Sequence, residues 1–232
     1  MDWEILAQEW FAAANSEDEK RCRQAEMKAR KLLRNRQYNE LQWHLEALAE
    51  QTEEHFYRRH FIRIALRDVN QMPDALFAPM LWAAVYAEDP SFNRLYIYPC
   101  LRCFGRRKVN EELLRYAEQG SNSEKCGAAN AFYWSLVSDL KGMPHEDIQD
   151  LVLQIRIWQL TEFVTNIDVN VRRNIVPHLK MDVNKYPSEL RALLPEAIRI
   201  AREHSDDYIR HRIEIQLGSG GPSQALPARP TE

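Results

Sequence analysis

The chain has 232 residues, of which 45% are hydrophobic and 28% charged, a balance typical of a globular protein with a substantial buried core. The formal net charge of −3 excludes a global basic excess that would draw the protein to nucleic acid, so local basic clusters need separate judgement. The acidic start MDWEILAQEW lacks the positive charge of a signal peptide, and no uninterrupted apolar run approaches the ~18 residues of a membrane helix. We therefore expect a cytoplasmic protein without a membrane span.

Apolar residues spaced three and four apart, together with capping and stop residues, predict an all-α chain of eleven or twelve helices. In chain order the predicted helices cover residues 2–14, 16–36, one helix capped by Asn39, one begun by Thr52, 73–87, 90–104, 111–118 capped by Asn110, 124–140 capped by Ser123, 144–164, 168–180, 187–203 and 206–217. The Gly/Ser/Pro-rich tail 218–232 cannot bury a core, so we expect it to be disordered.

Two segments, 38 residues apart, repeat one pattern: NIDVNVRRNIVPHL (166–179) and HSDDYIRHRIEIQL (204–217). Each starts with a polar turn that can cap a helix, followed by an apolar residue and an arginine. The matched pairs are Asp168 with Asp206, Val171 with Ile209, Arg172 with Arg210, Ile175 with Ile213, and Leu179 with Leu217. A looser copy lies at 113–136, where Gly127 stands in place of the arginine.

This pattern resembles HEAT repeats, and the resemblance is best over residues 110–217. It implies a right-handed α-solenoid of antiparallel helix pairs. Residues 1–80 show no clear HEAT pattern, and we expect them to form N-terminal helical hairpins within a single domain that covers 1–217. In HEAT-like units the arginine after the apolar residue usually ties adjacent turns together. The resemblance therefore assigns Arg172 and Arg210 a structural role, and we expect Pro177 to bend its helix at the loss of one hydrogen bond.

The sequence contains no motif that assembles a catalytic, cofactor or metal site. Cys100-x-x-Cys103 is the only CxxC, whereas a structural zinc site needs four ligands, so we interpret both cysteines as core residues on one helix face. His145-Glu146 is the sole His-Glu dipeptide, and one copy cannot build a di-iron site. GxSxG, GxGxxG and P-loop motifs are absent. We therefore predict no bound cofactor.

Basic clusters are the remaining functional signal. The residues that could contact a partner or phosphate are Arg59, Arg63 and Arg67, spaced four apart, and Arg172, Arg173, Arg210, His211 and Arg212, at matched positions of the two repeats. A third cluster, Arg102, Arg106, Arg107 and Lys108, surrounds a helix end. The matched residues could stack into a basic ridge able to meet phosphates, although basic residues on a solvated face are the simpler interpretation.

These observations favour a non-enzymatic scaffold that binds a protein partner on a concave surface of successive second helices. One alternative is a nucleic-acid-binding protein or a DNA glycosylase of the HEAT-like kind. Such a glycosylase needs an acid among aromatic residues, and no position in the sequence can be matched to that arrangement. Another alternative is an accessory factor of an enzyme or of a cofactor-attachment system.

Overall fold

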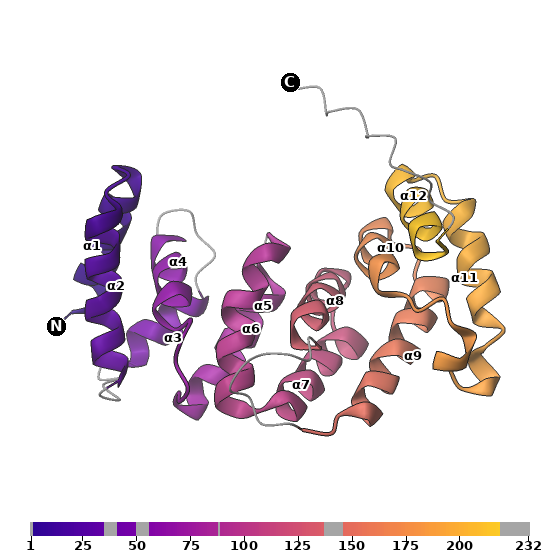
Figure 1. The fold of residues 1–232 in the computed structure, drawn as a ribbon, viewed down its shortest axis with the longest axis horizontal. Coiled ribbons are helices and arrows are strands. Elements are labelled where there is room, and N and C mark those ends of the chain that lie inside the picture. The colour runs from indigo at the N-terminus through magenta and orange to yellow at the C-terminus, as the bar shows by residue number, and fades with distance from the viewer. Residues whose placement is uncertain (1, 35–40, 50–55, 88, 137–145, 219–232) are drawn as a thin grey trace. The chain divides into compact units, whose positions relative to one another are not determined.

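The computed structural model describes residues 2–34, 41–49, 56–87, 89–136 and 146–218, and all regular secondary structure in these ranges is helical (Figure 1). This confirms the all-α prediction. The chain divides into two compact units, and the second begins at Leu153. Within the described ranges, no helix combines the length and the apolar character needed to cross a membrane. The expectation of one domain over 1–217 stays a prediction.

Twelve α-helices lie in the described ranges, in agreement with the predicted eleven or twelve. The first unit contains α1 (Trp3–Asn15), α2 (Glu19–Arg34), α3 (Leu41–Ala49), α4 (Phe56–Ala65), α5 (Phe77–Val85), α6 (Pro90–Phe104), α7 (Arg106–Gln119) and α8 (Asn122–Ser135). The unit boundary falls within α9 (Gln149–Thr165), and α10 (Val169–Ile175), α11 (Leu193–Arg202) and α12 (Asp207–Gln216) follow. Short 3-10 helices are η2 (Asp74–Leu76), η3 (Val176–His178), η4 (Val183–Lys185) and η5 (Ser188–Leu190).

In the first unit, consecutive helices pack in pairs, and the pairs pack on one another (Figure 1). The paired contacts join α1 to α2, α3 to α4, α5 to α6 and α7 to α8. Contacts between pairs join alternate helices (α2 with α4, α4 with α6, α6 with α8, α3 with α5, and α5 with α7) and also α1 with α4, α5 with α8, and α6 with α7. The α3/α4 pair and the α5/α6 pair therefore each meet the next pair through both of their helices.

An aromatic cluster holds α1, α3 and α4 together. Trp3 of α1 is fully buried, and its ring lies 5.8 Å from Trp43 and 4.4 Å from His44, both on α3. The Phe61 ring of α4 lies 6.1 Å from the same indole. Aromatic rings bury a large apolar area for few rotatable bonds, so this cluster can anchor α1 on α3 and α4.

Glu4 lies beside this cluster and bonds to two other helices. Its carboxylate accepts hydrogen bonds from Trp43 Nε1 of α3 at 2.9 Å and from the Tyr57 hydroxyl of α4, and it pairs with Arg58 at 2.7 Å. Burial alone would raise the pKa of Glu4, but the hydrogen bonds from Trp43 and Tyr57 outweigh it and hold the pKa below its ordinary value. The folded state therefore favours the ionised form.

The predicted start of the helix at 111 is wrong, because α7 begins at Arg106. Gly105 ends α6 with φ +86°, a backbone region in which residues with a Cβ are strained. The Arg107 N–H in the first turn of α7 donates to Glu146 Oε2 at 2.8 Å, where an acid complements the helix dipole. Asn110 is not a cap: it is buried inside α7, and its Oδ1 accepts a hydrogen bond from the Ser135 hydroxyl at 2.6 Å.

The cap of α8 is Ser121 and not the predicted Ser123. Ser121 and Glu124 exchange side-chain-to-backbone hydrogen bonds in a capping box, which requires the acid three residues after the cap. Gly127, which stands in place of the repeat arginine, lies against the end of α5. A Cβ at this position would meet the Val85 carbonyl oxygen at 1.8 Å, so only glycine permits this approach of the two helices.

In the second unit the predicted helix 168–180 is shorter than expected. α10 ends at Ile175, and the chain tightens into η3, which contains Pro177. Proline lacks the N–H that would continue the α-helical ladder, so the helix ends instead of bending through it. The Pro177 carbonyl accepts a hydrogen bond from Gln216 Nε2 of α12 at 2.5 Å, and this bond ties η3 to the final helix.

The predicted helix 187–203 is also too long at its start. Ser188 begins the 3-10 helix η5, and α11 begins only at Leu193. Pro195 then occupies the first turn of α11, where its missing N–H has no partner to lose. The predicted helix 144–164 starts too early, because residues 146–148 are not helical and α9 begins at Gln149. The predicted caps Asn39 and Thr52 and the tail from 219 lie outside the described residues.

We predict that Glu4→Gln lowers the free energy of unfolding at pH 7 by about 2 kcal/mol, because hydrogen bonds to a charged group are lost across two helix contacts. A depressed pKa contributes stability that is fully present above the unfolded pKa of about 4.3 and is lost as the pH falls through the lower folded pKa. Urea unfolding at pH 7 and over pH 5 to 3 should show the difference between the two proteins shrinking below about pH 4.3.

Glu9→Gln is the matched control, since Glu9 lies on the same helix and makes only an exposed ion pair with Lys28. Its effect should stay below about 0.5 kcal/mol at every pH. An E4Q protein as stable as the wild type at pH 7 would contradict the role of Glu4 as a tie between helices.

Candidate functional site

The two repeat segments begin their second helices in the same way. Asp168 is the N-cap of α10, and its side chain accepts from the Asn170 and Val171 N–H groups at 2.8 and 3.1 Å. Asp206 is the N-cap of α12 and accepts from the Ile209 N–H at 3.1 Å. Val171 and Ile209 are fully buried. The capping turn and the apolar anchor predicted from the repeat are therefore confirmed in both copies.

In each repeat, the arginine after the buried apolar residue donates hydrogen bonds near the end of the helix that comes before it in the chain, α9 for Arg172 and α11 for Arg210. Arg172 Nε donates to the Phe163 carbonyl at 3.1 Å, in the last turn of α9. Arg210 donates to the His204 carbonyl, just beyond α11, and pairs with Asp207. Both guanidinium groups thus satisfy carbonyls that lack partners inside a helix. These hydrogen bonds are of the kind expected for the structural role of the two arginines, and that role stays a prediction.

Arg173 connects the two repeats. Its Nε lies 3.4 Å from the Asp206 carboxylate, the N-cap of the next second helix, and its guanidinium lies 5.6 Å from the Tyr208 ring centre. The pairing is partly exposed, since the Arg173 side chain is 43% accessible. Arg173 therefore links α10 to α12 while one side of its side chain faces solvent.

The remaining two ridge residues differ from each other. His211 is exposed, whereas Arg212 is half-buried near η3. Burial lowers the pKa of His178 in η3 to about 4, and the neighbouring charges of Lys180 and Arg212 add to this effect. The five residues therefore do not form one open basic ridge, because three are half-buried and the exposed Arg173 is paired.

Two exposed apolar side chains, Val169 and Tyr208, lie near Arg173 at the start of α10 and α12. Val169 lies one helical turn before Arg173, and Tyr208 lies against its guanidinium. Ile167, two residues before Val169, is 87% exposed, and Val169 and Tyr208 are each 38% exposed. We name Ile167, Val169, Arg173 and Tyr208 the apolar edge. Sequence reasoning missed it, although apolar residues inside the polar turn N-I-D-V were a readable signal.

The three arginines at four-residue spacing do not form an exposed stripe. Arg63 is 7% exposed and stacks on the Phe92 ring at 3.8 Å, and Arg67 lies beyond the end of α4 beside Asp68. Arg59 is half-buried on α4. Only Arg59 and Arg63 lie on α4 and share its helical spacing, because the helix ends at Ala65. The spacing alone did not predict that Arg63 is buried.

The basic cluster around residues 102–108 is engaged within the first unit. Arg102 donates to the Val69 and Arg67 carbonyls, and Lys108 lies over the Phe77 ring at 4.5 Å. Arg107 forms a two-pronged ion pair with Asp150, with N–O distances of 2.8 and 3.0 Å. The hydrogen bonds from Arg107 lower the pKa of Asp150 to about 2. These contacts join α6 and α7 to neighbouring segments of the first unit.

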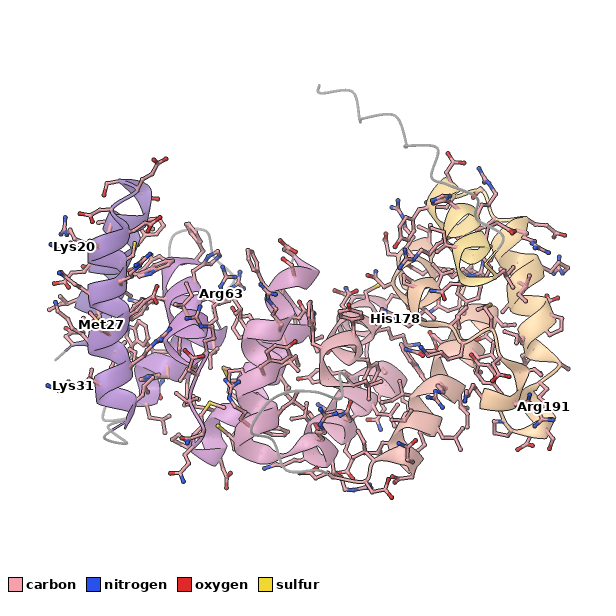
Figure 2. All side chains as sticks on the ribbon, viewed as in Figure 1. Lys20, Met27, Lys31, Arg63, His178 and Arg191 are labelled. Atoms are coloured by element: carbon pink, nitrogen blue, oxygen red, sulfur yellow. The ribbon has the colours of Figure 1, made fainter. Side chains whose placement is uncertain are left out.

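One exposed cationic face was passed over in the sequence. Lys20, Met27 and Lys31 lie on the side of α2 that points away from α4 (Figure 2), and all three are exposed. Within the described ranges no side-chain hydrogen bond or ion pair holds Lys20, Arg21 or Lys31. Lys20, Met27 and Lys31 share one face of α2, because spacings of seven and four residues bring side chains to the same side of a helix.

The cysteines fit a packing role. Cys100 is fully buried, and its pKa lies well above the ordinary value because burial penalises the thiolate. Burial also raises the pKa of Cys103 to about 11, and its Sγ lies 3.8 Å from the Val69 carbonyl oxygen. No group of three or more potential metal ligands was found within the described ranges. His145 lies outside those ranges, and Glu146 caps α7.

An acid among aromatic side chains exists at Glu4, the arrangement that a HEAT-like glycosylase would need. Its carboxylate is already held by Trp43, Tyr57, Arg58 and Gln8. These bonds assign Glu4 to the contact between helices.

No family model, curated protein or solved structure matches the chain, so the likeness to HEAT repeats rests on the residues of the repeat themselves.

Proposed function

We propose that the chain is a non-enzymatic scaffold, a right-handed α-solenoid of HEAT-like antiparallel helix pairs that binds a protein partner along its second helices. The contacts of the first unit support this architecture. Pairs stack through α3, α5 and α7 on one side and through α4, α6 and α8 on the other, as stacked two-helix repeats do. Contacts of α1 with α4 and of α2 with α4 extend the same stack to the N-terminal hairpins.

The second unit supports the repeat reading on a smaller scale. α12 packs against α11 within its own pair and against α10 and η3 of the preceding repeat. The Arg173–Asp206 pair and the Gln216–Pro177 hydrogen bond join the same two repeats. The N-caps Asp168 and Asp206 and the carbonyl bonds of Arg172 and Arg210 recur at matched positions, which favours a repeated unit over an irregular bundle.

The apolar edge is the observation that carries the partner-binding proposal. It combines a tyrosine, an arginine and two aliphatic side chains at the N-terminal turns of two successive second helices. Tyr and Arg are enriched among residues that dominate protein interfaces, whereas nucleic-acid contacts rely on uncompensated positive charge. Arg173 is held by Asp206, so the edge presents apolar area and one oriented guanidinium rather than a basic field.

An accessory factor of an enzyme or of a cofactor-attachment system would use the same edge. The scaffold and the accessory factor would therefore differ in the partner that they bind and not in the surface that binds it. Identification of the captured protein distinguishes the two functions.

We predict that the double variant Ile167→Asp with Tyr208→Ala weakens partner capture at least about tenfold, because each change removes an exposed apolar contact without opening the core. The immobilised full chain would be used to capture proteins from extract of its source cell, and the captured set would be quantified by mass spectrometry for wild type and variant. A specific partner should be depleted in the variant.

Val183→Asp is the matched control, since Val183 has similar exposure in the same unit but lies in η4, away from the edge in sequence. It should keep the whole captured set. A partner that survives the edge variant and is lost with V183D would refute the edge as the interface.

A second candidate function, nucleic-acid binding, is favoured by the exposed face of α2 with Lys20, Arg21 and Lys31. Cations without acidic partners can release counterions from phosphate, which is the main source of nonspecific affinity for nucleic acid. The simpler explanation is that α2 ends the stack, because terminal units of repeat proteins carry a polar outer face. The matched arginines of the second unit support this function less, since Arg173 and Arg210 are paired.

We predict no binding of a labelled duplex or single strand tighter than about micromolar at moderate salt. Lys20→Glu with Lys31→Glu, and Arg173→Glu with Arg212→Glu, separate the two basic surfaces. Fluorescence anisotropy at low and moderate salt would measure both. Salt-sensitive submicromolar binding that the first double variant abolishes would replace the scaffold proposal by a nucleic-acid contact on α2. Binding that is lost only with Arg173→Glu and Arg212→Glu would instead place the nucleic-acid contact on the matched arginines of the second unit.

A further inference from the structure

The exposed side of α12 continues beyond the apolar edge. Tyr208, Arg212 and Ile215 are spaced by four and three residues, which brings their side chains to one side of the helix. Tyr208 is 38% exposed, Ile215 is 44% exposed, and Arg212 is half-buried. We name these three residues the α12 strip. Because α10 packs against α12 (Figure 1), the strip starts beside Arg173, whose guanidinium lies 5.6 Å from the Tyr208 ring centre.

Arg212 differs from the other arginines of the two repeats in its contacts. Arg172 and Arg210 donate to carbonyls, and Arg173 pairs with Asp206. Within the described ranges, by contrast, no carboxylate lies within 4.0 Å of the Arg212 guanidinium, and its buried Nε has no hydrogen-bond partner. A partly buried cation without an anion loses solvation that an incoming carboxylate would replace.

The acids of α12 do not compensate this charge. Asp207 pairs with Arg210, and Glu214 pairs with Arg202 of α11 at 2.7 Å. After α12 the next acid in the chain is Glu232. The free cation of the strip therefore has no carboxylate of its own helix to meet.

The helical backbone of the strip favours a helical partner. Its N–H and C=O groups bond within α12, so they are not open to an added strand. The strip carries one aromatic ring, whereas grooves for proline-rich segments are lined by several. A partner segment must therefore satisfy its own backbone hydrogen bonds, as an amphipathic helix does. From Tyr208 to Ile215 the strip runs for about 10 Å, or two helical turns, so apolar residues seven apart would meet both ends.

We propose that the α12 strip binds an acidic amphipathic helix of a protein partner, with apolar residues of that helix on Tyr208 and Ile215 and a carboxylate on Arg212. This inference rests on the proposed partner-binding function and gives the partner its chemistry. The planar guanidinium suits a carboxylate because it can donate two parallel hydrogen bonds. Charge therefore selects the partner, and the exposed apolar side chains at the two ends of the strip supply the area that is buried.

The test is a titration of the full chain with alanine-based helical peptides, followed by amide shifts in NMR spectra. The acidic peptide carries leucine at i and i+7 and glutamate at i+3 and i+4, so a carboxylate meets Arg212 in either direction of the peptide. Two matched peptides carry glutamine or lysine in place of glutamate. We expect the acidic peptide to saturate with a Kd below about 1 mM and to shift residues 208–215 most, and the glutamine peptide to bind at least about tenfold more weakly. Absence of saturation by the acidic peptide, or equal binding of all three, would overturn the proposal.

Variants of the chain locate the contact. Arg212→Gln and Ile215→Asp should each weaken binding of the acidic peptide about tenfold or more, and Arg212→Glu should bind the lysine peptide instead. Lys185→Glu is the matched control, because it makes the same change of charge as R212E at an exposed lysine of η4, and it should leave both affinities unchanged. If R212E fails to fold, R212Q and I215D still decide. Equal affinity in R212Q, I215D and the wild type would reject the strip.

Other occupants of the strip give different results. A second copy of the chain would appear in sedimentation as a dimer that Ile215→Asp dissociates, and this would reject a partner helix. Tighter binding of the acidic peptide to Glu232→Gln would show that an acid of the same chain competes for Arg212, and it would reject the proposal as well. Salt-sensitive binding of a single-stranded oligonucleotide that Arg212→Gln abolishes would replace the carboxylate by phosphate.

Failure of this inference is distinguishable from failure of the apolar edge. Partner capture that Ile167→Asp with Tyr208→Ala removes, and that Arg212→Gln leaves unchanged, would refute the acidic helix and keep the edge. Peptide binding that depends on Arg212, together with a captured set that the double variant leaves intact, would reject the edge and keep the α12 strip.

Discussion

Every α-helix leaves N–H groups at its start and carbonyls at its end without partners inside the helix, and α10 has only seven residues in which to offset that cost. Asp168 supplies acceptors at its start, and Arg172 covers the open carbonyls of α9 before it. The α12 segment repeats the solution with Asp206 and Arg210. Satisfaction of helix ends by one acid and one arginine per repeat is the interaction on which the second unit depends.

This constraint also decides which charges remain for other molecules. Arg172 and Arg210 are committed to carbonyls, and Arg173 to the next N-cap, so the repeated arginines hold the stack instead of presenting phosphate contacts. The apolar edge lies exposed beside them. The buried guanidinium of Arg63 contrasts with them, because no backbone carbonyl or carboxylate of the described residues completes it.

The helical class, the helix at 90–104 and both N-caps of the repeat followed from the sequence, because period, caps and proline position act locally. Other features depended on tertiary contacts. α7 begins directly after Gly105 ends α6, because Glu146, 41 positions later in the chain, accepts a hydrogen bond from the first turn of α7. The sequence does not distinguish the buried Arg63 from the exposed basic residues of α2. Arg63 is buried because it packs against Phe92, a contact that only the fold supplies. The apolar edge needed both repeats in three dimensions.

The most direct test of this account is the free energy of unfolding of Arg172→Met, measured by urea denaturation beside His211→Ala. The methionine keeps the apolar stem and removes the donors to the Phe163 and Val164 carbonyls. The account predicts a loss of about 1 to 3 kcal/mol for R172M and less than about 0.5 kcal/mol for the exposed His211. Unchanged stability of R172M, together with lost binding of a partner or nucleic acid, would contradict it and make the repeated arginine a ligand contact.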